Sequence, residues 1–226
     1  MNSGASTKLI KGDRGILSAS EIEANIRPDD IHFPRTSLVC LENTVNVGGG
    51  NCYNLSTIVD IKEVCNKYNL KLHLDGARLF NALIAKNQSP KDYGKLFHSI
   101  SICLSKGLGS PVGSLLLGTN EFIAKSRRVR KAFGGGMRQA GIIAAAGEYA
   151  LKNNVDRLQE DHDHAKKIGE ALLNSESVSN VEPIETNIIC MEVNHPVLDA
   201  FDFERLLKEK GIRVFALDIN TIRITV

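Results

Sequence analysis

Neither sign of charge is in excess in this sequence. Lys and Arg together number 28 and Asp and Glu 26, which gives a formal net charge of +2. A balance so close to neutral supplies no basic field of the kind that attracts nucleic acid or an anionic membrane surface. We therefore expect the partner to be a small molecule, and neither a nucleic acid nor a membrane.

Long apolar runs are also missing. The first twenty residues hold no apolar core of signal-peptide length, and no later stretch is long enough to span a bilayer. The five cysteines lack CxxC spacing, and Cys40, Cys65 and Cys103 fall in apolar patterns that suit buried free thiols. We expect a reducing compartment, the cytoplasm, with the mitochondrion as an alternative because several bases precede the first acid at Asp13.

The sequence does contain a strand, helix, strand pattern. An apolar run of strand length at 37–42 precedes apolar residues at helical spacing over 55–69, and a second strand is predicted at 70–74. Such a βαβ unit forms parallel strands with a right-handed crossover. Residues that follow the second strand, beginning with Asp75, therefore lie where open α/β sheets bind their ligands.

Further elements are predicted along a chain that shows no internal repeat. The predicted helices span 18–26, 121–132, 142–173 with a break near 153–154, and 202–210. The additional predicted strands span 99–104, 113–118, 187–193, 212–214 and 221–225. This order indicates an α/β large domain over 1–140, a helical connection over 141–175 and a small α+β domain over 176–226.

Two segments place an ionisable residue directly after a strand, Asp75 in 73–82 and Lys106 in 101–114. Small residues follow each of them and allow the backbone to turn sharply. Pyridoxal phosphate (PLP) needs a partly desolvated lysine near positive charge to condense with its aldehyde. It also needs a carboxylate that keeps its pyridine nitrogen protonated. Each residue alone is more often a turn or capping residue, but together they make Lys106 and Asp75 candidates for a PLP site.

Six segments of the chain match one enzyme family in sequence and in order. They are DDIHFPRT (29–36), LENT (41–44), HLDGARLFNA (73–82), CLSKGLGSPVGS (103–114), the run 131–165 and TIRITV (221–226). Together they resemble the low-specificity L-threonine aldolases, from about residue 10 onward. The resemblance implies the PLP-dependent transferase fold of aspartate aminotransferase, with an incomplete large domain and a small α+β C-terminal domain.

The resemblance also implies roles for four residues. In the family, the lysine that matches Lys106 forms the Schiff base with PLP, and the aspartate that matches Asp75 contacts the pyridinium nitrogen. The arginine that matches Arg78 lies against the cofactor and the substrate carboxylate, and the one that matches Arg223 also holds that carboxylate, as suits a bidentate guanidinium. Without the resemblance, Arg223 would be taken for a surface arginine on a strand.

The implied reaction is a retro-aldol cleavage of L-threonine or L-allo-threonine into glycine and acetaldehyde, with no metal. The family's PLP phosphate loop, its ring-stacking histidine and its final helix are expected to lie outside this sequence. Family members also carry a histidine near the substrate hydroxyl where this chain has Val45. A side chain without a polar atom cannot accept the hydroxyl proton, so we expect little turnover from this chain alone.

Several alternatives remain open at this point. The chain is an active aldolase, a catalytically impaired fragment, or a non-catalytic subunit that packs against a full-length homologue; a PLP β-eliminating lyase is a further candidate. As partners we expect an amino acid substrate and a second copy of the chain, in a dimer or tetramer. The pair His162 and His164 is interpreted as part of a solvated helix face, and Gly48 to Gly50 as a loop without the GK[ST] of a phosphate-binding loop.

Overall fold

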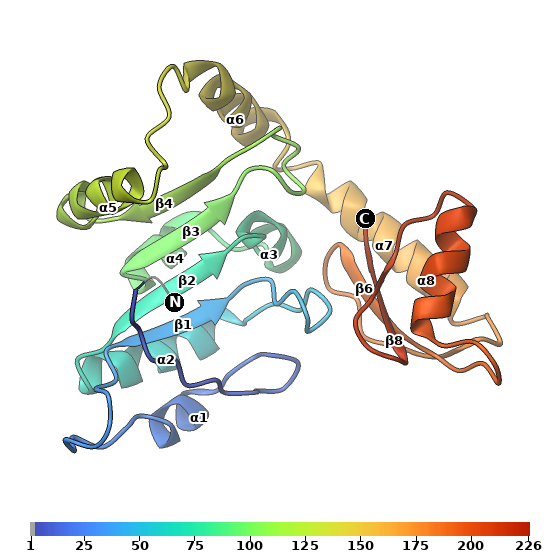
Figure 1. Ribbon diagram of the computed structural model, residues 1–226, viewed down its shortest axis with the longest axis horizontal. Coiled ribbons are helices and arrows are strands. Elements are labelled where there is room, and N and C mark those ends of the chain that lie inside the picture. Colours follow the sequence, from blue (N-terminus) through green and yellow to red (C-terminus); the bar gives the residue numbers. More distant parts are fainter. Residues whose placement is uncertain (1–2) are drawn as a thin grey trace.

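Two β-sheets joined by helices form the chain in the computed structural model, which describes residues 3–226 (Figure 1). The first sheet has the order β1-β2-β3-β4. Its members are β1 (Leu38–Glu42), β2 (Lys71–Gly76), β3 (Ser99–Cys103) and β4 (Ser114–Gly118). The first three strands are parallel and β4 is antiparallel to β3. The predicted βαβ unit is therefore confirmed, with α2 (Leu55–Lys67) connecting β1 to β2.

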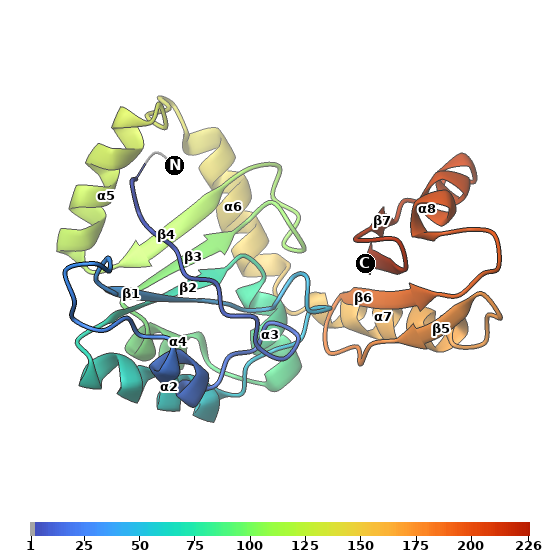
Figure 2. The same cartoon turned by 60° about the horizontal axis from the view of Figure 1, so that its bottom comes forward.

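One face of this sheet is covered by α2, α3 (Leu79–Lys86) and α4 (Pro90–Leu96) (Figure 2). Burial alternates along the strands because successive side chains point to opposite faces. Leu72 and Leu74 are buried with the apolar side of α2, whereas Asp75 points to the opposite face. The same alternation exposes Cys40, so the prediction that this thiol is buried is wrong.

The other predicted cysteines differ from each other in burial. Cys65 is buried on α2, as predicted, but Cys103 at the end of β3 is only half-buried. Cys52 and Cys190, which the apolar pattern did not single out, are both buried. All five thiols are free, in agreement with the sequence-based expectation.

The second sheet is antiparallel, with the order β5-β6-β8-β7. Its members are β5 (Val178–Val181), β6 (Ile188–Val193), β7 (Phe215–Ala216) and β8 (Thr221–Thr225), and α8 (Ala200–Glu209) packs against it. The strand predicted at 212–214 is wrong in position, because Phe215 and Ala216 are the residues that pair with β8. The capping box of Asp199 and Asp202 fixes the start of α8.

The remaining helices are α1 (Ala19–Ala24), α5 (Asn120–Ala132), α6 (Gly141–Asn153) and α7 (Leu158–Leu172). The predicted break near 153–154 is confirmed, since α6 ends at Asn153 and α7 begins at Leu158. α5 has no buried residue. The predicted domain boundaries at 140 and 175 stay predictions. Within residues 3–226, no helix is both long enough and apolar enough to cross a membrane.

His162 lies in the interior and not on a solvated face as predicted. It is 1% exposed and shares the buried side of α7 with Leu158, Ala165 and Gly169. This side contacts α3, from which the Asn81 amide nitrogen lies 3.1 Å from His162 Nε2. The imidazole is therefore buried with a hydrogen-bond partner from a helix 81 residues away in sequence, which no local pattern indicates.

Stability should fall in mild acid because of His162. Burial lowers the pKa of this imidazole below its ordinary value of 6.5. The unfolded chain therefore binds more protons than the folded one below about pH 6.5, and stability is lost as the pH falls through that value. Urea unfolding between about pH 7.5 and pH 5.5 should show this decline in the free energy of unfolding. His162→Gln should reduce the slope of that free energy against pH by up to about 1.4 kcal/mol per pH unit. An unchanged slope in the variant would contradict the assignment.

Candidate active site

Asp75 and Lys106 lie at the carboxyl ends of neighbouring parallel strands, β2 and β3, at the same edge of the sheet. Asp75 lies inside β2, which ends two residues later than predicted, and its Oδ1 accepts a hydrogen bond of 3.1 Å from the Ala77 amide. In the register of the sheet Asp75 is opposite Glu42 of β1 on one side and Ser101 of β3 on the other. The carboxyl ends of the first three strands thus meet where Asp75 is exposed.

The turn that carries Lys106 is built from close backbone packing. The carbonyl of Lys106 accepts a hydrogen bond of 2.8 Å from Gly109, whose φ of 72° favours glycine. A Cβ at Gly107 would lie 2.9 Å from Leu158 Cδ2, so the turn packs tightly on the start of α7. The Lys106 side chain is exposed and makes no hydrogen bond or ion pair within residues 3–226. The expectation of a partly desolvated lysine is therefore wrong for this structure.

Arg78 and Arg223 meet although they come from different sheets. Arg78 is the residue before α3, and Arg223 lies in β8. The Nη1 atoms of both donate hydrogen bonds of 3.1 Å to the same atom, Asn46 Oδ1. Arg223 is half-buried over the Phe215 ring, so it is not the surface arginine that its strand position alone suggests. The structure brings the two predicted carboxylate-binding residues together.

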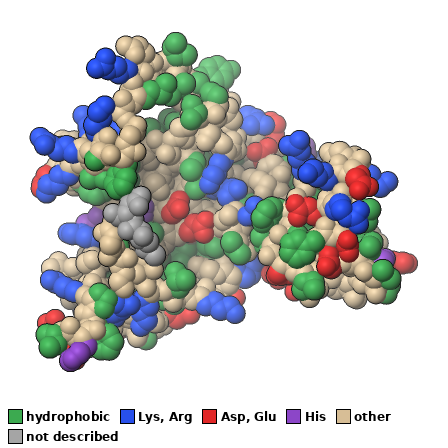
Figure 3. Space-filling model, in the orientation of Figure 1, with side chains coloured by type: hydrophobic (Ala, Val, Ile, Leu, Met, Phe, Trp, Pro, Cys, Tyr) green, Lys and Arg blue, Asp and Glu red, His purple; other side chains and the backbone are tan. Residues whose placement is uncertain are grey.

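Glu42 lies among the candidate residues, at the end of β1. Burial raises the pKa of its carboxyl, and the negative charge of Asp75 raises it further. The charges of Arg78 and Lys106 act in the opposite direction, which places all three groups within electrostatic range of Glu42. In Figure 3, acidic and basic side chains gather in the recess in the middle of this face. Glu42 and Asn46 were missed as site residues, although Glu42 ends β1 and Asn46 follows it. Asp75 and Lys106 occupy the corresponding places at the ends of β2 and β3.

A cleft of about 430 Å³ lies between the two sheets. Arg78 and Lys106, which follow strands of the first sheet, line one side of it, and Asn187 and Thr225 line the side of the second sheet. A larger apolar groove of about 1240 Å³ lies elsewhere, near the opposite ends of the strands, where Lys71, His98 and Phe122 are among its lining residues. None of the candidate site residues lines that groove, so we place the site in the smaller cleft.

Val45 does not face the site. It is 5% exposed and belongs to the apolar core of the first sheet. Gly15 packs directly on it, since a Cβ at Gly15 would lie 2.5 Å from Val45 Cγ1. The expectation that this side chain lies beside the substrate hydroxyl is corrected by this packing.

Val45→His should therefore destabilise the protein. The imidazole would lose water without gaining a partner, at a cost of about 1–3 kcal/mol in the free energy of unfolding. The neighbouring Val47 is 68% exposed and serves as the matched control, because Val47→His should change that free energy by less than about 0.5 kcal/mol. Urea unfolding of the two variants measures the difference, and equal stabilities would show that Val45 is not a core residue.

Comparisons with known proteins agree on the family. The family model described as beta-eliminating lyase matches residues 1–195. The probable low-specificity L-threonine aldolase 2 of Arabidopsis thaliana is 40% identical over 226 residues, which cover 98% of this chain and 64% of that protein. The low specificity L-threonine aldolase of Escherichia coli O157:H7 is 49% identical over 179 residues, 79% of this chain and 52% of that protein. The chain thus spans between half and two thirds of the length of these relatives.

Solved structures confirm the predicted fold class. A putative aromatic amino acid beta-eliminating lyase/threonine aldolase from Exiguobacterium has a TM-score of 0.76 at 25% identity, over 93% of this chain and 59% of that one. The Leishmania major threonine aldolase, at 22% identity, has the same fold with a TM-score of 0.76 over 95% of this chain and 63% of that one. Taken with the family model and the curated relatives, these findings show that the chain belongs to the beta-eliminating lyase family, alongside the low-specificity L-threonine aldolases.

Proposed function

We propose that this chain carries the site of a PLP-dependent aldehyde-lyase that cleaves L-threonine and L-allo-threonine into glycine and acetaldehyde. The observation that supports it best is that Arg223 meets Arg78 at Asn46, and that Arg78 lines a cleft together with Lys106. Two guanidiniums beside a free amine suit a substrate that has a carboxylate next to its reacting carbon. The names of the curated relatives support the choice of threonine as the substrate.

The residues present fit PLP. The ammonium of Lys106 is exposed at the end of β3, next to the β2 strand end that carries the Asp75 carboxylate. Arg223 Nε is buried and has no hydrogen-bond partner in the described chain, which leaves a donor for a carboxylate. Lys106 would hold the cofactor through its aldehyde, and Asp75 would pair with the ring nitrogen. When bound, PLP supplies a sink for the electrons of the bond that breaks at Cα.

The protein's own groups supply binding and proton transfer. Arg78 and Arg223 bind the substrate carboxylate and orient the bond to be broken, which removes much of the entropic cost of reaching the reactive geometry. Glu42 is the half-buried carboxyl beside Arg78 and Lys106, and its raised pKa suits a group that takes up the β-hydroxyl proton. We propose Glu42 for this step, since Val45 is in the core.

Turnover by the unmodified chain is expected to be slow. Lys106 and Asp75 are both exposed, and water weakens the electrostatic interactions on which the reaction depends. The experiment is to mix the purified chain with PLP, record the visible absorbance and assay acetaldehyde from L-threonine and L-allo-threonine. A visible band with slow acetaldehyde release supports an impaired aldolase site. Pyruvate or ammonia in place of acetaldehyde would favour a β-eliminating lyase, and no band at all would overturn the proposal.

We also propose a cytoplasmic location and assembly of the chain with a second copy or a longer homologue. The free thiols support a reducing compartment. Exposed apolar side chains on α5, on α6 and between them support assembly, because exposed apolar patches commonly mark interfaces: Val129, Phe133, Met137, Ile142 and Tyr149. Sedimentation over a range of concentrations would distinguish an assembled chain from a monomer.

A further inference from the structure

The side chain of Asn46 is shared by two arginines. Its Oδ1 accepts 3.1 Å hydrogen bonds from Arg78 Nη1 and from Arg223 Nη1. Because a guanidinium only donates, the atom between the two must be the amide oxygen and not the amide nitrogen. Asn46 is thus a neutral acceptor placed where two positive charges converge.

This arrangement holds together groups that repel each other. Burial lowers the pKa of Arg78, and the positive charge of Arg223 lowers it further. One amide oxygen offsets little of this repulsion, because it carries no net charge. Arg223 Nε is also buried without a partner in the described chain. The pair therefore keeps both its charge and an unused donor, and a carboxylate would satisfy both.

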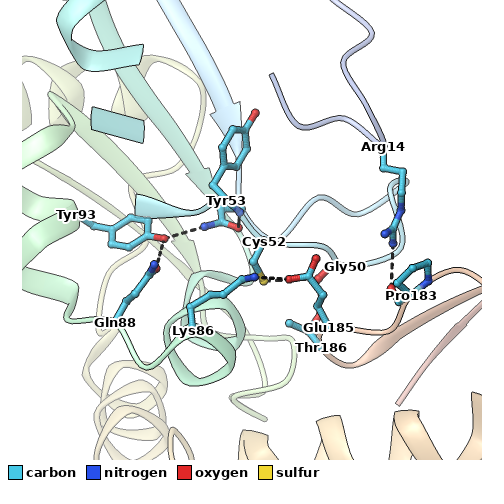
Figure 4. A network of polar contacts seen from close by, with 11 residues as sticks. Arg14, Gly50, Cys52, Tyr53, Lys86, Gln88, Tyr93, Pro183, Glu185 and Thr186 are labelled. Carbon is cyan, nitrogen blue, oxygen red and sulfur yellow. Dashed lines mark hydrogen bonds and ion pairs between the residues drawn. The ribbon is translucent and has the colours of Figure 1, made fainter. Parts of the chain in front are cut away.

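The loop that carries Asn46 follows β1 of the first sheet and is hydrogen-bonded to the segment that precedes β6 of the second. Within the loop, the Gly50 amide donates 2.8 Å to the Val45 carbonyl. Toward the second sheet, the Thr186 hydroxyl donates 2.6 Å to the Gly50 carbonyl (Figure 4). The ion pair of Lys86, at the end of α3, with Glu185, at 2.6 Å, ties the same segment before β6 to the helices of the first sheet. Asn46 therefore stands at a fixed point between the sheet that supplies Arg78 and the sheet that supplies Arg223.

We propose that Asn46 is the positioning residue of the carboxylate-binding pair. This inference rests on the proposed function and adds a determinant of specificity to it. The Asn46 amide holds Arg78 and Arg223 at the separation that one carboxylate can bridge, and because it is neutral it leaves their charge available. An aspartate here would occupy both guanidiniums from within the protein, and an alanine would release them to move apart.

The test uses the 226-residue chain without cofactor. The probes are L-threonine and L-threoninamide, which differ in the carboxylate, and binding is followed by NMR of the arginine Nε–H groups. The unsubstituted chain should bind threonine at least about tenfold more tightly than the amide. Asn46→Asp should remove this preference and keep or raise the midpoint of thermal unfolding, because the new carboxylate pairs with both arginines. Asn46→Ala should weaken threonine binding and also lower the midpoint.

Asn174→Asp is the control, since it adds the same charge at an exposed position after α7 and should change the threonine affinity by less than about twofold. A purely structural role for Asn46 would make affinity and stability change together in both Asn46 variants. The inference is overturned if Asn46→Asp binds threonine as tightly as the unsubstituted chain, or if that chain shows no preference for threonine over the amide. A different result would separate the inference from the proposed function. If Asn46→Asp abolishes threonine binding but the unsubstituted chain releases no acetaldehyde, the inference stands and the proposed function is overturned.

Discussion

Lys106→Ala should abolish the covalent attachment of PLP and lower threonine cleavage by at least about a hundredfold. The lysine amine is the group that condenses with the aldehyde, and a positioned proton-transfer group alone contributes about a hundredfold to ten-thousandfold in rate. Lys106 is favoured over the other lysines because it follows β3, the neighbour of the strand that carries Asp75, and its ammonium has no partner in residues 3–226. Borohydride reduction of the chain with PLP, followed by peptide mass spectrometry, locates the adduct without any need for turnover.

The matched control is Lys95→Ala, which removes an exposed lysine on α4 whose one ion-pair partner among residues 3–226 is Asp92 of its own helix. This variant should keep the adduct, the visible absorbance band and the residual cleavage rate. A predominant adduct on a lysine other than Lys106 in the unsubstituted chain would show that the cofactor site has been assigned to the wrong residue.

The parts of the fold that local patterns encode were predicted from the sequence. Strands β1, β2 and β3 are apolar runs bounded by turn residues, so the positions of Asp75 and Lys106 at one sheet edge followed from them. Short elements escaped prediction. β5 has four residues and little apolar content, and α3 and α4 follow β2 so closely that their helical spacing was not resolved.

The relation between the two sheets could not be predicted, because it depends on contacts between residues far apart in sequence. Arg223 reaches Asn46 across 177 positions, and His162 reaches Asn81 across 81. Neither contact leaves a local pattern, which is why Arg223 was placed by resemblance alone and His162 was wrongly placed on a solvated face. Val45 was misplaced for the same reason, since its burial depends on Gly15 of a distant loop.

Asp75→Asn should lower the rate of chemistry by about a hundredfold to a thousandfold and leave the attachment of PLP to Lys106 nearly unchanged. An amide can still meet the ring nitrogen, but it cannot hold the positive charge that makes the ring an effective electron sink. Loss of one such electrostatic contact typically costs this factor in rate. The substitution should leave the local structure unchanged, because Asp75 is exposed and an asparagine oxygen can accept the same hydrogen bond from the Ala77 amide.

The measurement for Asp75→Asn is the exchange of the α-hydrogens of glycine with D₂O, followed by NMR in the presence of PLP. This exchange requires electrons to be taken up from Cα but does not require threonine cleavage, so it reports the electron sink even where acetaldehyde release is slow. Borohydride trapping on the same samples reports attachment at Lys106. The expected result is a large loss of exchange with little loss of trapping. Equal losses of exchange and of trapping would mean that Asp75 supports the binding site as a whole. Full exchange in the variant would show that Asp75 has no part in the reaction, and Glu42 would then be the carboxylate to examine at the ring nitrogen.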